Sequence, residues 1–246
     1  MNIEDHKLIK KIIKEAIFLD LKVVRDELVG SETQRQKYNA NLAIRYISPI
    51  ISQVKRIELI SFCFNCKNKE LKKSEKVIIP TENYFRDFIG LWDRVLNFIK
   101  YIYDIKQTSS IDDVIKNDTV DKKLRNKLKD IKDNFDRVYR IRVDSTHVNS
   151  PIEECDEDIR RMISYENLLT ETLTDKKLDG TFKFRLEALL DITFKKNKKK
   201  YKNLMDLLNE RLEKELYELL DIVYCKYDNN LKPLSTVKKT IRKGIS

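Results

Sequence analysis

Hydrophobic residues recur along most of this chain at the three- and four-residue spacing that is typical of amphipathic helices. Residues 7–28 show this pattern, and Gly30 supplies a stop signal after them. A second helical pattern covers 32–54, where we expect a kink or break near Pro49 because proline lacks a backbone N–H. The chain is therefore predicted to begin with a helical region over 7–54.

The pattern changes over residues 57–80, where apolar residues cluster without a clear helical period. The run at 57–64 resembles a strand, 67–76 is charged, and 77–80 forms a second short apolar run. These features predict a small β-hairpin, or an irregular excursion, between two helical regions.

The most regular helical pattern follows Pro80. Thr81 is placed as an N-cap, and the apolar stripe after it has the spacing of one helix face. The stripe consists of Phe85, Phe88, Ile89, Trp92, Leu96, Ile99 and Tyr103. A polar linker over 107–118 contains a short amphipathic piece, and helical periodicity then returns from Val120 to Ile141.

Helix boundaries are marked in the C-terminal half of the chain. The Ser-Pro-Ile-Glu sequence at 150–153 is a capping box with proline at the first helical position. We therefore expect a helix from Pro151 to about Thr174. After a turn at Asp179-Gly180, a last helix is predicted over 183–226, interrupted by the basic run at 195–200.

Composition supports an all-α fold. Glycine and proline number only 4 each, too few for the many tight turns of a barrel, sandwich or Rossmann unit. No stretch of about 18 apolar residues is present, so we expect no membrane span. The N-terminus lacks an apolar leader, and the four cysteines fit reduced thiols better than a disulfide framework. We therefore expect a cytoplasmic protein.

The charge balance bears on the partner. The net charge is +10, from 50 Lys and Arg against 40 Asp and Glu. This excess favours a polyanion such as RNA. A composition rich in Lys, Ile and Asn also arises in an AT-biased genome, so charge alone leaves both explanations open.

One segment, from Arg140 through Arg142 to His147, combines side chains that suit a specific catalytic chemistry. On an unbroken helix Arg140 and His147 fall within about 20° of each other, whereas Arg142 and His147 diverge by about 140°. A helix break before Ser150 lets Arg142 approach as well, so both arginines are candidates. Histidine transfers protons near neutral pH and arginine holds phosphate, which together suit phosphodiester cleavage. The alternative is a helix-end histidine that is only a cap or a solvated residue.

This segment resembles the signature of the HEPN superfamily, in which an arginine and a histidine are separated by four to six residues near a helix end. Arg142 fits with four intervening residues, and Arg140 fits with six. The resemblance covers about 81–175. It implies an all-helical homodimer, and for many members a metal-independent endoribonuclease of toxin–antitoxin, abortive-infection or CRISPR-associated systems. It also implies that histidine and arginine form a composite cleft at the dimer interface.

Asp93 is a further candidate, because a carboxylate on the flank of the apolar stripe should have a partner. The resemblance implies a polar residue on this helix that orients His147 or an arginine. The alternative for Asp93 is an ordinary ion pair with Arg86, Arg94 or a lysine.

The basic run offers candidate contacts to an RNA backbone. These are Lys195, Lys196, Lys198, Lys199 and Lys200, with Phe194 and Tyr201 beside them as stacking candidates. A solvated helix face is the alternative.

No metal or cofactor site is predicted. Cys63 and Cys66 have the spacing of half a zinc site, but no second pair of ligands follows. No glycine-rich phosphate loop, nucleophile elbow or His-Glu-x-x-His motif is present either.

Together these patterns predict an all-α, HEPN-like helical bundle forming one domain over 1–246, with its core over about 81–175. The predicted function is metal-independent RNA cleavage by a homodimer, with an antitoxin or other regulatory protein as a further partner. The rival hypothesis is a non-catalytic helical module that binds RNA, a nucleotide or a protein.

Overall fold

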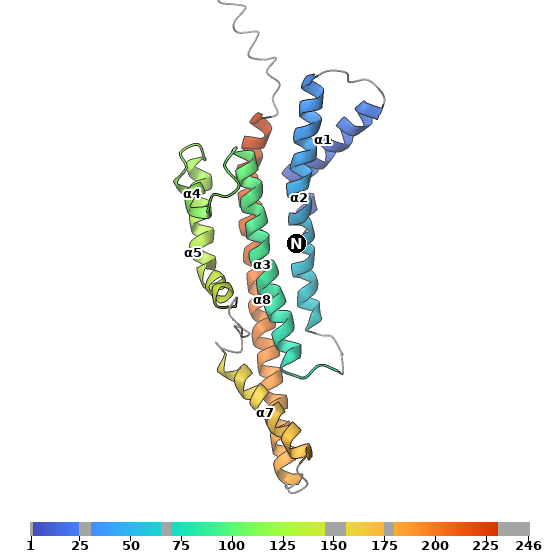
Figure 1. Cartoon of the computed structure of the whole chain (residues 1–246), viewed down its shortest axis with the longest axis vertical. Helices are drawn as coiled ribbons and strands as arrows, with labels where there is room; N and C mark the ends of the chain where they lie inside the picture. Colours follow the sequence, from blue (N-terminus) through green and yellow to red (C-terminus); the bar gives the residue numbers. More distant parts are fainter. Residues whose placement is uncertain (1, 25–30, 65–69, 146–155, 175–179, 231–246) are drawn as a thin grey trace, which may run out of the picture. The chain divides into compact units, whose positions relative to one another are not determined.

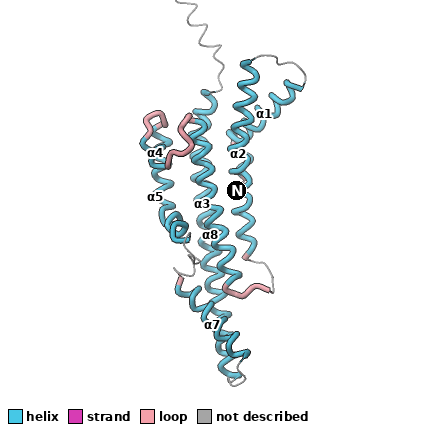
Figure 2. The backbone as a smooth tube through the Cα atoms, in the orientation of Figure 1, coloured by secondary structure: helices cyan, strands magenta, loops and turns pink. Residues whose placement is uncertain are grey.

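A computed structural model describes residues 2–24, 31–64, 70–145, 156–174 and 180–230 (Figure 1). Helix side chains are described except those of 18–24, 31–41, 61, 136–145, 172–174 and 228–230. The described residues are mostly helical, and no strand occurs among them (Figure 2). The prediction of an all-α fold is confirmed.

Helices account for most of the described chain. In order they are the 3-10 turn η1 (Ile3–Asp5), α1 (Lys7–Val24), α2 (Ser31–Cys63), α3 (Glu75–Ile102), α4 (Ile111–Lys116), α5 (Lys122–Ser145), α7 (Glu157–Thr174) and α8 (Gly180–Asn230). Helices α1 and α5, and the short helix α4 within the polar linker, form where the sequence pattern predicts them.

The predicted β-hairpin over 57–80 is wrong, because α2 and α3 extend into this region from its two sides. Val77 and Ile78 are buried, Ile79 is exposed, and Thr81 is again fully buried. Burial with this spacing matches one broad face of a helix. The apolar run at 77–80 is therefore part of the wide buried face of α3, whereas in the run at 57–64 the side chains of Leu59 and Phe62 are exposed.

Two prolines lie inside these helices without ending them. Pro49 is within α2 and Pro80 within α3, so of the kink or break predicted near Pro49 the break is wrong and the kink stays a prediction. Thr81 is likewise not an N-cap, since α3 has already begun at Glu75. Its hydroxyl instead donates to the Val77 carbonyl at 2.6 Å. This bond supplies a side-chain donor in the turn where Pro80 removes a backbone N–H.

Helix α7 ends at Thr174 as predicted, but it begins later than Pro151. Asp156 is not helical, and its carboxylate accepts the backbone N–H of Asp158 at 2.9 Å. Asp156 is therefore the N-cap of α7. The predicted capping box at 150–153 lies outside the described residues.

Helix α8 runs without interruption from Gly180 to Asn230, so the predicted break at 195–200 is wrong. Lysine is a good helix former and does not stop a helix. Asn197, inside the basic run, is fully buried. Its amide donates to the Thr193 carbonyl at 3.0 Å and to the Met162 sulfur of α7 at 3.4 Å. One face of the run is thus packed on α7.

The chain divides into two compact units, each assembled from separate stretches of sequence. Unit 1 contains Ile50–Asp93 and Asp133–Glu213. Unit 2 contains Asn2–Pro49, Arg94–Lys132 and Lys214–Ser246. The assignment of 1–246 to one domain remains a prediction.

Unit 1 has an aromatic core. The Phe88 and Phe135 rings meet edge to face at 5.0 Å, and Trp92 lies 5.5 Å from Phe135. The Tyr84 hydroxyl donates to the Asn209 side chain of α8 at 2.8 Å. Helices α3, α5 and α8 are joined through these contacts.

Unit 2 is joined by polar contacts as well as apolar ones. Lys127 of α5 forms ion pairs with both Glu215 and Glu218 of α8. The Tyr103 hydroxyl, beyond the end of α3, donates to Asp121 at 2.6 Å. These contacts fix α5 and the end of α3 within the unit.

Candidate functional site

Helix α5 carries both candidate arginines near its C-terminal end. Arg140 and Arg142 belong to the helix, which ends at Ser145. The positions of their side chains, and His147 as a whole, lie outside the described residues. The structure therefore gives the backbone register of the arginines.

Phe135 identifies the face of α5 that packs in unit 1. It is 1% exposed and contacts Phe88 and Trp92 of α3. Arg142 follows seven residues later, which places it within about 20° of Phe135 around the helix axis. Arg140 follows Phe135 by five residues and lies about 140° away. By its position around the helix axis, Arg142 lies on the face of α5 that packs in unit 1, and Arg140 does not.

Asp93 lies on α3, one residue after the packed Trp92. It is partly buried and takes part in a polar interaction. Of its predicted alternative partners, Arg86 donates to Asn83 instead. Asp93 is therefore on the helix that faces α5, while its role in orienting an arginine or His147 stays a prediction.

The lysines of the basic run differ in their surroundings. Lys196 pairs with Asp158 at 2.7 Å and Lys200 pairs with Asp156 at 2.6 Å, so both anchor α7 to α8. No ion pair to a described residue occurs at the remaining three, which are Lys195, Lys198 and Lys199. Of these three, the first and last are exposed and the middle one is partly exposed.

Tyr201, predicted as a stacking candidate, is buried and its hydroxyl donates to Asp156. A ring held in the interior cannot stack on an RNA base, so this prediction is wrong. Phe194 is partly exposed.

A cluster around Asp156 was not predicted from the sequence. This carboxylate is buried, caps α7, and accepts hydrogen bonds from Lys200 and Tyr201 of α8. Burial raises the pKa of Asp156, but the hydrogen bonds from Lys200, Tyr201 and the Asp158 backbone and the charge of Lys200 together outweigh burial, and the net pKa is lowered. An aspartate directly before Glu157-Asp158 is an N-cap signal in the sequence.

The other histidine, His6, has a structural position in unit 2. Its Nδ1 accepts the backbone N–H of Leu8 at 3.2 Å, so the ring hydrogen is on Nε2, which lies 3.1 Å from Asp221. Lys7 pairs with the same carboxylate at 2.9 Å. Burial lowers the pKa of His6, and Asp221 opposes this effect only in part. His6 therefore caps α1 and attaches it to α8.

The family of the chain follows from comparison with known families. A model of the Cthe2314-like HEPN family matches residues 26–205. The chain belongs to this HEPN family. The match contains α2 through α7, the first part of α8 and the whole Arg140–His147 segment. It confirms the resemblance drawn from the Arg–His motif.

Comparison with individual proteins gives no further match to this HEPN chain. No curated protein and no solved structure matches it significantly. The family is therefore known, whereas the reaction and the catalytic residues are matters for proposal.

Two further properties of the HEPN chain concern its described residues alone. None of the described helices is long and apolar enough to cross a membrane. Among the same residues no group of three or more His, Cys, Asp or Glu side chains is arranged to hold a metal ion. Cys63 is exposed at the end of α2, and Cys66 lies outside the described part.

Proposed function

We propose that this HEPN protein is a metal-independent endoribonuclease. Support comes from its family membership over a region that includes an arginine and a histidine with the family's spacing. The net charge of +10 suits a polyanionic substrate. His147 acts as the general acid or base, and Arg142 holds the phosphate.

In the proposed reaction the 2′-oxygen of RNA attacks the adjacent phosphorus as its proton passes to a base. The bond between phosphorus and the 5′-oxygen breaks, and that oxygen takes up a proton. His147 carries out proton transfer at one of these two oxygens. An arginine stabilises the charge that develops on the non-bridging oxygens. The products carry a 2′,3′-cyclic phosphate and a 5′-hydroxyl.

The choice of Arg142 over Arg140 rests on the register of α5. Arg142 continues the face on which Phe135 packs against α3, the helix that also carries Asp93. A guanidinium on this face can be held in place by groups of α3, and a positioned guanidinium binds phosphate at a lower entropic cost. Asp93 is the α3 carboxylate that we propose for this positioning role.

We further propose a homodimer in which two copies complete the site, as the family resemblance implies. RNA contacts are assigned first to Lys195, Lys198 and Lys199, whereas Lys196 and Lys200 also pair with aspartates at the start of α7. Lysines on the surface of α8 contribute to RNA binding mainly because they release counterions from the RNA backbone.

The test is cleavage of single-stranded RNA by the full chain in EDTA, comparing wild type with His147→Ala. We expect cleavage by wild type and its loss in the variant. His6→Asn is the matched control, because this second histidine is part of a structural cap and Asn also serves as an N-cap. Equal cleavage by wild type and His147→Ala removes His147 from the mechanism. Binding without cleavage by either favours the non-catalytic alternative.

A further inference from the structure

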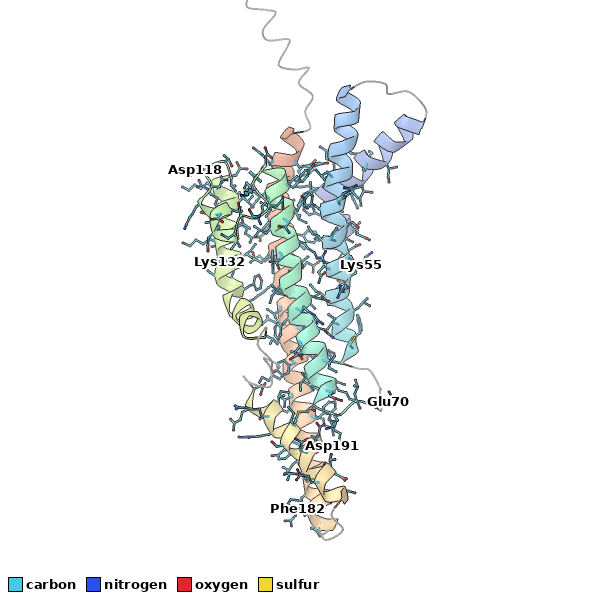
Figure 3. The ribbon with its side chains drawn as sticks, viewed as in Figure 1. Lys55, Glu70, Asp118, Lys132, Phe182 and Asp191 are labelled. Carbon is cyan, nitrogen blue, oxygen red and sulfur yellow. The ribbon has the colours of Figure 1, made fainter. Side chains whose placement is uncertain are left out.

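The N-terminal part of α8 exposes a regular seam on unit 1. Successive residues of this seam are separated alternately by three and by four positions. We call the set the α8 seam. They are Phe182, Arg185, Leu189, Ile192, Lys196 and Lys199. At about 100° per residue, all six positions fall within an arc of about 100° on the helix surface. Figure 3 labels Phe182, the first of them, in the N-terminal part of α8.

This spacing is that of the a and d positions of a coiled coil. In a coiled coil such side chains pack against a second helix, yet here they are open to solvent. Phe182 is 44% exposed, Leu189 is 47% exposed and Ile192 is 64% exposed. The packed face of α8 is a different one, formed by Leu186 and Leu190, each 5% exposed. The seam is therefore an additional, partly apolar face and is not part of the unit 1 core.

The charges of the seam have one sign. Half of its six members are basic and none is acidic. The acidic residues of this part of α8, Glu187 and Asp191, fall outside the arc, and Asp191 pairs with Lys73. Lys196 pairs with Asp158 at 2.7 Å while its side chain remains 65% exposed. A partner must therefore offer apolar groups to three positions and negative charge to the other three.

We propose that the α8 seam binds an acidic amphipathic helix of another protein in the manner of a coiled coil. The partner helix places apolar residues against Phe182, Leu189 and Ile192, and carboxylates against the three cations. Over the seam the two helices contact each other for about five turns.

Other occupants fit the seam less well. A second α8 aligned in parallel sets Arg185 and both lysines against their own copies, and like charges at a seam repel. Single-stranded RNA uses aromatic rings for stacking, and Leu189 and Ile192 offer none. A bilayer needs a continuous apolar face, whereas here Arg185 lies between Phe182 and Leu189.

The proposal does not depend on ribonuclease activity, and its test uses binding alone. The probes are two fluorescein-labelled synthetic peptides, designed for the parallel and antiparallel orientations. Each carries leucine opposite the apolar seam residues and glutamate opposite the cations. A control peptide of each orientation carries lysine in place of those glutamates. Anisotropy is measured with the full chain at low and high salt.

We expect at least one acidic peptide to bind saturably and more weakly at high salt, and both lysine peptides to bind far less. The double variant Leu189→Ser, Ile192→Ser should weaken binding about tenfold or more, because buried apolar anchors dominate such interfaces. The matched control is Phe184→Ser, which removes an apolar side chain that is 72% exposed. Because Phe184 lies about 160° around the helix from Phe182, this control should change affinity by less than about twofold.

Any one of four results overturns the proposal. The first is absence of binding by both acidic peptides, and the second is equal binding by a lysine peptide. The third is an affinity that the double variant leaves unchanged while circular dichroism shows both proteins folded. Oligouridine and vesicles of phosphatidylcholine with phosphatidylglycerol are measured in parallel. Seam-dependent binding of either one, without the acidic peptides, assigns the seam to RNA or to a membrane and also overturns the proposal.

Discussion

The Asp156 carboxylate accepts a hydrogen bond from the Lys200 ammonium at 2.6 Å while it caps the first turn of α7. Part of a basic run that suggests nucleic-acid binding is therefore internal to the fold. The same run contains Asn197, which is fully buried against α7. A charge pattern along a helix does not distinguish cations that face solvent from cations that anchor a neighbouring helix.

Replacing Asp156 with Ala should lower the free energy of unfolding by about 2–3 kcal/mol at pH 7, because an N-cap and a charged hydrogen bond are lost together. Urea unfolding followed by circular dichroism gives the value. Glu157→Gln is the control, since its carboxylate is 71% exposed and pairs only within α7. A similar loss in both variants would contradict a specific role for Asp156.

The Asp156 carboxylate also predicts how the free energy of unfolding changes at acidic pH. Because the pKa of Asp156 is lower in the folded chain than its ordinary value of 3.8, its contribution is complete above that value. The contribution is lost as the pH falls through the folded pKa. The stability difference between wild type and Asp156→Ala should therefore narrow when unfolding is measured at pH 3 and below. A difference that stays constant down to pH 2 would argue against this carboxylate as its source.

The titration of His6 predicts a change in the free energy of unfolding between about pH 7.5 and 5.5. Burial lowers its pKa below the ordinary 6.5, so the unfolded chain binds protons first as pH falls. Its contribution is complete above about pH 6.5 and decreases below it, because protonation of Nδ1 removes the acceptor of the cap bond from Leu8. His6→Asn keeps a cap but cannot titrate. Urea unfolding at pH 7.5 and 5.5 should show a smaller decrease in His6→Asn than in wild type, and an equal decrease would refute this assignment.

The register of α5 predicts unequal effects of the two arginines. Arg142→Ala should reduce RNA cleavage about 100-fold, and Arg140→Ala less than about threefold, because one group is held at the reacting phosphate and the other is not. Single-turnover rates on one RNA, with both variants shown to be folded, provide the comparison. The reverse order would mean that Arg140 is the motif arginine, as expected if the helix continues unbroken to His147.

The lysines of α8 should separate into two groups. Lys195→Gln together with Lys198→Gln should weaken RNA binding and reduce its salt dependence by about two counterions. The stability of the chain should remain unchanged. Lys200→Gln should do the opposite, because it removes the bond to Asp156. Filter binding at several salt concentrations and urea unfolding together decide whether this division holds.

The all-α fold was predictable because few glycines and prolines and a persistent helical period agree with each other. The hairpin prediction failed at Val77–Pro80, where α3 is buried over a wide face and its alternation is obscured. A proline in the same run suggested a boundary, although Thr81 supplies a hydroxyl in that turn. Local patterns identify a helix well when its buried face is narrow and poorly when its buried face is wide.

The candidate site was predictable only as a segment. The Arg–His spacing led to the HEPN family, and the family match confirms it. The capping role of Asp156 and the choice between two arginines depend on which helices meet, and that information is not local in the sequence. Phe135 illustrates this dependence, because its contacts with Phe88 and Trp92 set the register of Arg142.

The central claim is most directly tested by the role of the substrate's own 2′-hydroxyl. The full chain is incubated in EDTA with a short RNA and with the same RNA carrying 2′-O-methyl groups, and the product ends are analysed by mass spectrometry. We expect wild type to cleave only the unmodified RNA, leaving 2′,3′-cyclic phosphate, and His147→Ala to cleave neither. Cleavage of the methylated RNA, or equal cleavage by the variant, would contradict this account.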